Sequence, residues 1–262
     1  MLTIRGVAVD VSSRWARWVG LAGRVARRAG PGADPGPGAG AAGDGPGWTG
    51  GASLPPGVDP GAPLFAVPFV VLDVETTGGS PSTAALTEIA AARFVGGECR
   101  GTFQTLVDPG CAVPPLISLL TGITDAMVAG APPVSSVLPS LQEFAAGAVV
   151  VGHNVAFDLS FLDAALAACG RRPLGHHAAV DTLALARRLL RPDVPNCRLR
   201  TLAAVLGLDH APTHRALDDV RATADLLHLL IERATAYGVF VLADLLELGS
   251  PGGAGVGRAR VS

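Results

Sequence analysis

Short apolar segments alternate with longer helical segments between about residues 63 and 237, and this alternation constrains the fold of the 262-residue chain more than any other feature. Such a pattern is typical of an α/β domain, in which helices cover a central sheet. Gly96 and Gly97 are expected near a turn between two strands, because paired glycines favour tight hairpins. Strands are predicted at residues 69–74, 86–95, 102–107 and 148–151.

The helical segments are bounded by residues that start or stop helices. Gly170 and Pro173 end one segment, Asp181 or Thr182 caps the next, and Gly207 ends a short one. The sequence predicts helices at residues 134–146, 156–169, 182–190, 199–206 and 215–237, of which the last is the longest.

The two ends of the chain differ in composition from this region. Residues 1–29 hold six arginines and one acid, with Trp15 and Trp18 at helical spacing. This basic extension is either a short amphipathic helix that contacts a membrane surface or a partner, or a poorly ordered start of the chain. Residues 30–62 are rich in Gly, Pro and Ala and are expected to be a disordered linker. Residues 238–262 are expected to be a C-terminal tail.

Charge and cysteine content narrow the class of protein. The formal net charge is −2, so composition alone does not make the whole chain a polyanion binder. No apolar run is long enough to span a membrane. The cysteines show no metal-ligand spacing and are expected to be reduced thiols, which favours a cytoplasmic protein. They are Cys99, Cys111, Cys169 and Cys197.

An acidic pair ends the first predicted strand. Asp73 and Glu75 are two residues apart, so both side chains point to the same face of a strand. Adjacent carboxylates repel each other unless a cation lies between them. The turn at residues 76–78 places the pair at the carboxyl end of the strand, where α/β sheets usually bind ligands. Taken alone, the pair could equally be two solvated acids on an edge strand.

A third acid, Asp158, lies near the start of a predicted helix that follows a buried strand. A carboxylate in the first turn of a helix can simply stabilise that helix by interacting with its dipole. The preceding Gly152, His153 and Asn154 favour a functional role, because polar residues here would line the same crevice. His153 is either a loop histidine with internal partners or a substrate contact.

A histidine and a fourth acid come together at the start of the longest predicted helix. His214 precedes Asp219 by five residues, and imidazole is the usual general base near neutral pH. Asp218 is a competing candidate for the acid. Arg215 and Asp225 are expected on a solvated face of the helix.

Carboxylates that are scattered in sequence but gathered by a fold are what hard divalent cations need. Mg²⁺ takes oxygen ligands and keeps waters and substrate phosphates in its shell. Two such ions stabilise the attacking and leaving oxygens of a phosphodiester displacement. The four acids and His214 therefore predict a metal-dependent nuclease.

Together the three segments resemble the three motifs of the DEDDh exonucleases, a family typified by the proofreading epsilon subunit of bacterial DNA polymerase III and by ribonuclease T. The resemblance covers about residues 66–235 and implies a ribonuclease-H-like α/β fold, with a central mixed β-sheet flanked by α-helices. The matching residues are Asp73-Val74-Glu75-Thr76-Thr77-Gly78, His153-Asn154-Val155-Ala156-Phe157-Asp158 and His214-x-Ala216-x-x-Asp219.

The resemblance also implies an activity and a set of site residues. Residues 63–237 would form an exonuclease domain that removes nucleoside monophosphates from a 3′ end with two divalent cations, Mg²⁺ or Mn²⁺. The general base would be His214. The implied metal ligands, which are also catalytic residues, are Asp73, Glu75, Asp158 and Asp219. The expected substrate contacts are Thr76, Thr77, His153 and Asn154.

Single-stranded 3′ ends of DNA, in proofreading or repair, are the expected substrate, and a DNA polymerase is a candidate partner. Trimming of RNA is a second hypothesis, because no residue pattern reads a 2′-hydroxyl. A module that binds nucleic-acid ends or a polymerase without cutting is a third. Some of eight arginines are expected to contact backbone phosphates, and at least half only to solubilise helices. These are Arg171, Arg172, Arg187, Arg188, Arg191, Arg198, Arg200 and Arg215.

Overall fold

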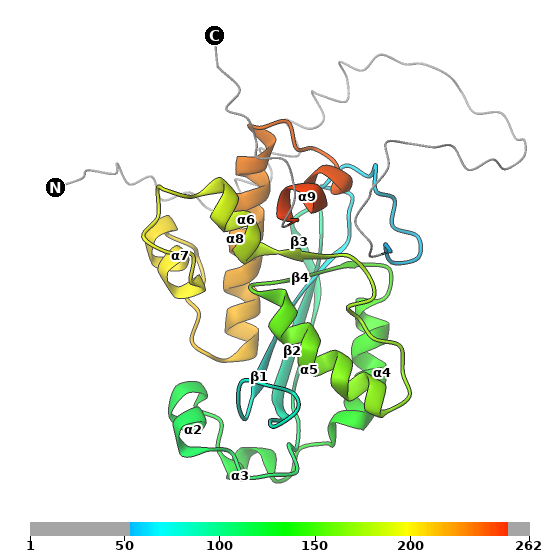
Figure 1. Ribbon diagram of the computed structural model, residues 1–262, viewed down its shortest axis with the longest axis vertical. Helices are drawn as coiled ribbons and strands as arrows, with labels where there is room; N and C mark the ends of the chain where they lie inside the picture. The colour runs from blue at the N-terminus through cyan, green and yellow to red at the C-terminus, as the bar shows by residue number, and fades with distance from the viewer. Residues whose placement is uncertain (1–52, 251–262) are drawn as a thin grey trace, which may run out of the picture.

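The computed structural model describes residues 53–250, which form a five-stranded sheet with helices on both faces (Figure 1). The strand order is β3-β2-β1-β4-β5. Strands β1 to β3 form an antiparallel meander, and β4 and β5 run parallel to β1, so the sheet is mixed. The strands are β1 (Phe69–Thr76), β2 (Leu86–Val95), β3 (Glu98–Leu106), β4 (Val149–Gly152) and β5 (Ala179–Asp181).

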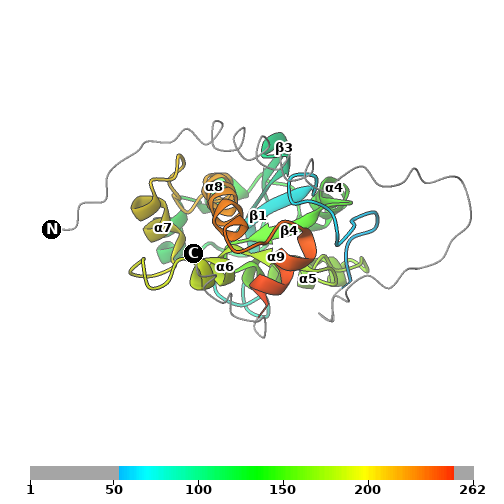
Figure 2. The same cartoon turned by 90° about the horizontal axis from the view of Figure 1, so that it is seen from above.

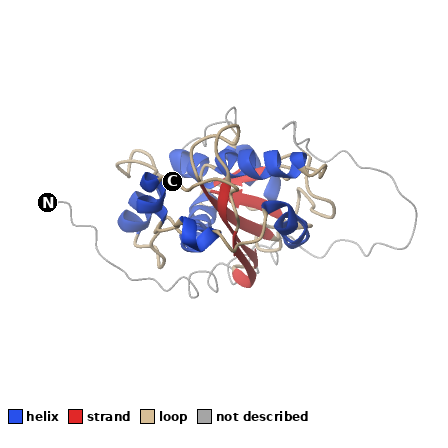
Figure 3. Ribbon diagram, turned by 90° about the horizontal axis from the view of Figure 1, so that it is seen from below, coloured by secondary structure: helices blue, strands red, loops and turns tan. Residues whose placement is uncertain are grey.

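Helices cover both faces of this sheet, as Figures 2 and 3 show. Helices α4 and α5 pack on one face, and α6, α8 and α9 pack on the other. The helices are α2 (Pro115–Thr121), α3 (Asp125–Val128), α4 (Val134–Ala145), α5 (Val155–Ala168), α6 (Thr182–Leu189), α7 (Leu199–Leu206), α8 (Ala216–Thr235) and α9 (Leu242–Gly249).

Strand β1 lies at the centre of the sheet because its first residues are apolar on both faces. Val70 and Leu72 pack into the core beneath α4 and α5, and Val71 packs into the core beneath α8. A fully buried aliphatic side chain contributes roughly 1.5–3 kcal/mol, so a strand of this kind is most stable between two layers of helices. Further along β1, Asp73 and Glu75 share the face of Val71.

The turn between β2 and β3 agrees with the sequence prediction. Val95 pairs with Glu98, which leaves Gly96 and Gly97 as a two-residue loop. Both glycines have positive φ, 60° and 77°, as a type I′ hairpin turn requires. The predicted strands and helices are present with ends that differ by a few residues, whereas β5, α2, α3 and α9 were not predicted.

Two predicted boundaries differ from the structure. Residues 53–62, the described part of the predicted linker, contact the domain: Ser53 pairs with His177, and Leu54 and Val58 pack against the core. The tail predicted at residues 238–262 contains α9, which packs against α6 and β5. In both cases a few apolar side chains bury enough surface to order a Gly- or Pro-rich neighbourhood. The basic extension at residues 1–29 lies outside the described residues, as do residues 30–52 and 251–262.

The structure also bears on the predictions about membrane-spanning segments and about the cysteines. Between residues 53 and 250, no helix combines the length and the hydropathy needed to cross a bilayer. All four cysteines fall in this part of the chain and are free thiols, of which only Cys197 is buried.

Candidate active site

The site lies where β4 ends and leaves one edge of β1 open. Strand β4 pairs with β1 only from Phe69 to Val71. Beyond that point, the Val74 N–H donates to Asp158 Oδ1 at 3.0 Å, because Asp158 reaches β1 from the first turn of α5. Asp158 is only 4% exposed. This hydrogen bond fixes the third acid beside the strand that carries the first two.

The turn from β4 into α5 is tight. A Cβ atom on Gly152 would lie 2.9 Å from Val155 Cγ2, so only glycine fits without a shift. Asn154 then takes the left-handed conformation, with φ of 70°, and its N–H donates to Asp181 Oδ1 at 2.9 Å. The two residues therefore determine where α5 begins and where Asp158 lies.

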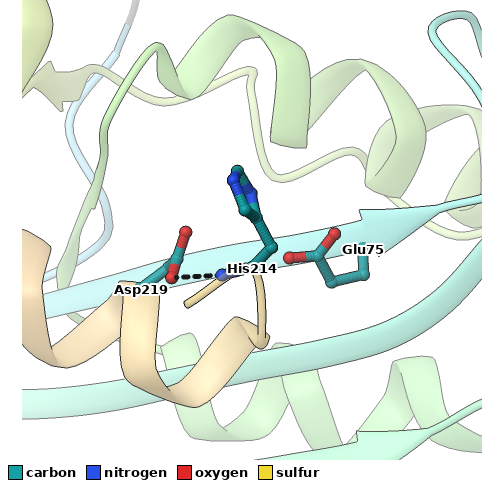
Figure 4. Close-up of side chains that lie close together, drawn as sticks. All are labelled: Glu75, His214 and Asp219. Atoms are coloured by element: carbon teal, nitrogen blue, oxygen red, sulfur yellow. Dashed lines mark hydrogen bonds between the residues drawn. The ribbon is translucent and has the colours of Figure 1, made fainter. Parts of the chain in front are cut away.

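Glu75, His214 and Asp219 come together from two elements (Figure 4). Glu75 comes from the end of β1, and the other two come from the start of α8. One potential ligand atom of each side chain lies within 4.8 Å of the other two. The imidazole is therefore close enough either to bind the same cation or to take a proton beside it.

His214 has a backbone conformation that is unusual for a residue with a side chain. Its φ is 62°, in the left-handed region, which costs roughly 1–2 kcal/mol for such a residue. Asp219 Oδ1 stabilises this conformation by accepting from the N–H groups of Thr213, at 2.9 Å, and His214, at 3.2 Å. Asp219 thus has one oxygen engaged in holding the histidine in place.

Asp219, and not its neighbour Asp218, joins the cluster. The Asp218 side chain is 41% exposed and contacts the Thr213 hydroxyl at 2.8 Å and the Arg221 guanidinium at 3.4 Å. These contacts turn it away from Glu75 and leave Asp219 as the acid of the pair that meets Glu75 and His214.

Burial and mutual repulsion raise the pKa of all four predicted ligands. Burial, followed by the charges of nearby carboxylates, raises the pKa of Glu75 to about 8 and that of Asp73 well above its usual value. Burial also raises the pKa of Asp158 to about 7 and that of Asp219 above its usual value. Without added positive charge the cluster cannot ionise completely near neutral pH. Its all-oxygen donor set therefore fits hard divalent cations.

His153 has partners within the protein for both ring nitrogens. Nε2 donates to the Cys197 carbonyl at 2.9 Å, and Nδ1 lies 3.0 Å from the Thr182 hydroxyl. Burial lowers the pKa of His153, which favours a neutral ring, and the Thr182 hydroxyl also contacts the Gly152 carbonyl at 3.0 Å. These contacts favour the first of its two interpretations, a loop histidine with internal partners, and its role at the substrate stays a prediction.

The two threonines after the acidic pair also have internal partners. The Thr76 hydroxyl donates to the Gly78 carbonyl at 2.6 Å, and the Thr77 hydroxyl accepts from the Ala85 N–H at 2.9 Å. The Thr77 N–H donates to the Ala85 carbonyl at 2.8 Å. Thr76 and Thr77 therefore hold the loop that follows β1, and their expected contact with the terminal nucleotide stays a prediction.

A cavity of about 750 Å³ opens beside the acidic cluster. Its lining includes His214 and Asp219 together with His153 and Asn154. Four of the eight arginines singled out in the sequence also line it: Arg187, Arg191, Arg198 and Arg200. The lining thus combines one acid of the cluster with four arginines, a set of charges that suits a phosphate-bearing ligand bound next to cations.

Sequence reasoning missed one acid beside the site. Glu88 of β2 is 1% exposed and pairs with Arg215 at 3.0 Å, so the partner of Arg215 is a buried acid of the sheet and not a helix-spaced residue, although 36% of the Arg215 side chain is exposed. Asp225 is buried as well and bonds His210 at 2.9 Å. The available signal was the single carboxylate in the mostly apolar strand at residues 86–95.

The mixed sheet and the acidic cluster at the carboxyl end of its central strand define a class: α/β domains with an acidic site that suits divalent cations, beside an arginine-lined cavity. The RNase_T family model, described as "Exonuclease", matches residues 70–227. Because this match spans more than half of the chain, the chain belongs to this exonuclease family. The resemblance drawn from the three motifs is thereby confirmed.

Curated relatives match the same part of the chain. A Mycobacterium tuberculosis protein, named as a bifunctional exonuclease/endonuclease, is 47% identical over 184 residues, which are 68% of this chain and 28% of that protein. The PolC-type DNA polymerase III of Clostridium perfringens is 40% identical over 159 residues, which are 61% of this chain and 11% of that protein. The chain thus spans less than a third of the length of either relative.

Solved structures share the fold. Exonuclease X in complex with 5′ overhanging duplex DNA aligns with a TM-score of 0.54 and 24% identity, over 70% of this chain and 99% of that chain. E. coli Exonuclease I in complex with a dT13 oligonucleotide aligns with a TM-score of 0.58 and 22% identity, over 65% of this chain and 42% of that chain. The predicted ribonuclease-H-like α/β class is confirmed.

Proposed function

We propose that this protein is a metal-dependent 3′→5′ exonuclease that releases nucleoside monophosphates from single-stranded 3′ ends of DNA. The observation that carries the proposal is the convergence of Glu75, His214 and Asp219 within 4.8 Å at the end of the central strand. Membership of the exonuclease family supports the same reaction class. The 3′→5′ direction and the release of single nucleotides rest on the resemblance of the three motifs to DEDDh exonucleases.

Two divalent cations, Mg²⁺ or Mn²⁺, are part of the proposal. Asp73, Glu75, Asp158 and Asp219 would hold them, because these four carboxylates share one buried site whose raised pKa values signal uncompensated negative charge. When bound, such cations neutralise phosphate charge and polarise the scissile phosphodiester. The chain itself contributes the positions of the carboxylates and a low-dielectric setting that strengthens their electrostatic effect.

His214 is the proposed general base. Its imidazole lies beside Glu75 and Asp219, and the bonds from Asp219 to the backbone of residues 213 and 214 hold it there. In this position it would accept a proton from the attacking water. A base fixed before the substrate arrives needs no rearrangement during the reaction.

The basic cavity is the proposed site for the substrate backbone. Arg187, Arg191, Arg198 and Arg200 line it next to the carboxylates. Guanidinium groups bind phosphate oxygens well because several donors lie in one plane. Backbone contacts of this kind would position a strand with little regard to its sequence. Four of the eight arginines singled out in the sequence are thus assigned to the substrate.

DNA is the proposed polymer, and a DNA polymerase is a proposed partner. The supporting observations are the oligonucleotides in the Exonuclease I and Exonuclease X structures and the similarity to PolC-type DNA polymerase III. A cytoplasmic location is proposed because all four cysteines are free thiols, as expected in a reducing compartment.

Digestion of labelled oligonucleotides tests the proposal. The wild-type protein should shorten 5′-labelled single-stranded DNA one nucleotide at a time with Mg²⁺ or Mn²⁺, and EDTA should stop the reaction. Asp219→Asn should lose several orders of magnitude in rate, since it removes a proposed ligand. Asp218→Asn is the matched control on the same helical turn and should keep the wild-type rate.

Other patterns of digestion would contradict specific parts of the proposal. Faster digestion of matched RNA would replace DNA with RNA as the substrate. Products that begin at the 5′ end would refute the direction. No digestion of either polymer by folded, metal-binding protein would refute the enzyme and favour a module that binds nucleic-acid ends.

A further inference from the structure

Glu88 lies beside the site with no role in the reaction described above. Its side chain, on β2, is 1% exposed, and an acid is rarely buried so completely unless it is paired. Its backbone pairs directly with that of Glu75 in the antiparallel β1–β2 ladder, so both side chains point to the same face of the sheet. A buried acid is thus anchored opposite a proposed metal ligand.

The protein itself satisfies the Glu88 carboxylate. Oε2 accepts from Arg215 Nε and from the Ala216 N–H, both at 3.1 Å. Oε1 accepts from Arg215 Nη2 at 3.0 Å and from Gln104 Nε2 at 2.9 Å. An ionised carboxylate has about four lone-pair positions, and four donors occupy them. Glu88 therefore has no lone pair left for a cation and is not a further metal ligand.

The contacts of Glu88 fix the start of α8. Arg215 is the N-cap residue of this helix and makes no capping hydrogen bond with its own side chain. The Ala216 N–H, one of the free donors at a helix start, is instead satisfied by Glu88 from the neighbouring sheet. The negative charge of Glu88 also lies at the positive end of the helix dipole.

Two carboxylates thereby hold four consecutive residues at the entry to α8. Asp219 binds the backbone of residues 213 and 214, and Glu88 binds the side chain of residue 215 and the backbone of residue 216. His214 lies in the middle with its left-handed φ of 62°. The contact with Glu88 ties this segment to the strand pair carrying Glu75 through polar groups.

We propose that Glu88 is a positioning residue that acts through Arg215 and Ala216 to hold His214 and Asp219 against Glu75. The inference rests on the proposed function, because it assigns the geometry of that same site. Loss of the Glu88 contacts would displace the proposed base His214 and the proposed ligand Asp219 together. The arginine-lined cavity, which is the proposed substrate site, would be unchanged. The rate of the chemical step should therefore fall while substrate affinity is preserved.

The first test compares Glu88→Gln with the wild type in steady-state digestion of single-stranded DNA with Mn²⁺. Glu88→Gln keeps the shape of the side chain but removes its charge. Its kcat should fall by about 10- to 100-fold, as is usual when a group that orients a metal site is changed, with KM near the wild-type value. Arg215→Lys should show the same pattern, because it keeps the charge but loses the two-pronged contact.

A matched control separates positioning from general loss of stability. Arg93 lies further along β2 and donates to the Phe144 and Ala146 carbonyls at 3.0 Å, in contact with the end of α4. Arg93→Ala should lower the melting temperature and leave kcat at the wild-type value. If Arg93→Ala lowers kcat as much as Glu88→Gln does, the effect of Glu88 is one of stability and the proposal is overturned.

A double-mutant cycle tests whether Glu88 acts through His214. In single-turnover digestion with excess enzyme, Glu88→Gln should reduce the rate by a smaller factor in the His214→Ala variant than in the wild type, because the part of its effect that acts through His214 is already lost. Independent losses that multiply would overturn the proposal, as would a wild-type kcat in Glu88→Gln. Failure of the wild-type protein to digest DNA would refute the proposed function instead, so the two failures are distinguishable.

Discussion

Replacing Asp158 with Asn should stabilise the cation-free protein while it abolishes activity. Asp158 is 4% exposed, and burial raises its pKa from 3.8 to about 7. At about 1.4 kcal/mol for each pH unit, its ionised form costs the folded state ~4 kcal/mol above pH 7. Asn is uncharged and keeps an oxygen for the Val74 N–H, although a neutral acceptor forms a bond weaker by ~1 kcal/mol. We expect a net gain of ~3 kcal/mol at pH 8.

The sign of the pH dependence follows from the raised pKa. The folded protein keeps the Asp158 proton up to about pH 7, whereas the unfolded chain releases it near its ordinary pKa of 3.8. Between these values the unfolded state binds fewer protons, so the stability of the wild type falls as pH rises. At pH 5 the cost is only ~1.6 kcal/mol, and folded Asp158 is then protonated, so its oxygen is as neutral an acceptor as that of Asn. The gain in stability of Asp158→Asn should therefore be roughly half as large at pH 5 as at pH 8.

Thermal unfolding in EDTA at pH 8 and pH 5 measures the effect. For a domain of this size ~3 kcal/mol corresponds to a rise in melting temperature of roughly 6–12 °C at pH 8. Asp163→Asn is the control on the same helix, because the Asp163 carboxylate accepts from the Leu174 and Gly175 N–H groups. It should not gain stability at pH 8. The reasoning is refuted if Asp158→Asn is less stable than the wild type at pH 8, or gains equally at both pH values.

Three further predictions concern the same region of the fold. Gly152→Ala should destabilise the protein by ~1–3 kcal/mol in urea unfolding, because the new Cβ would lie 2.9 Å from Val155 Cγ2 and 3.2 Å from Val155 Cα. An unchanged urea midpoint would contradict this. Mn²⁺ should raise the melting temperature more at pH 8 than at pH 6. Protons compete with the cation at Glu75 and Asp158, because the pKa values of these groups are about 8 and 7. An equal rise at both pH values would count against a carboxylate site. Asn154→Gly should keep wild-type stability, whereas Asn154→Val should lose ~1–2 kcal/mol at a φ of 70°; equal stability of the two variants would show that this backbone conformation is not required.

The fold was largely predictable because its elements are encoded by local patterns. The apolar run at residues 69–74 and the paired glycines at 96 and 97 indicate a strand and a hairpin regardless of the rest of the chain. Capping residues such as Asp181, whose side chain accepts from the Leu183 N–H, likewise act over a single turn. The short helices α2 and α3 carry no comparable pattern, which is why they were missed.

The four acids and His214 were also accessible from sequence, because their spacing within each motif is fixed by local geometry. Asp73 and Glu75 share a face on any strand, and His214 and Asp219 meet at the start of any helix that begins near residue 216. What local geometry cannot indicate is that these segments meet at the open edge of β1. That depends on β4 ending early and on Asp158 reaching the Val74 N–H.

Local sequence patterns are sufficient for four of the five strands, the main helices and the candidate acids of the site, because each depends on residues a few positions apart. The pairing of Glu88 with Arg215, in contrast, is visible only in the tertiary structure, because the two residues are far apart in the chain and meet when α8 docks on β2. The tertiary structure also decided that residues 53–62 and α9 belong to the domain, because their few apolar side chains are stabilised by a core that local sequence does not reveal.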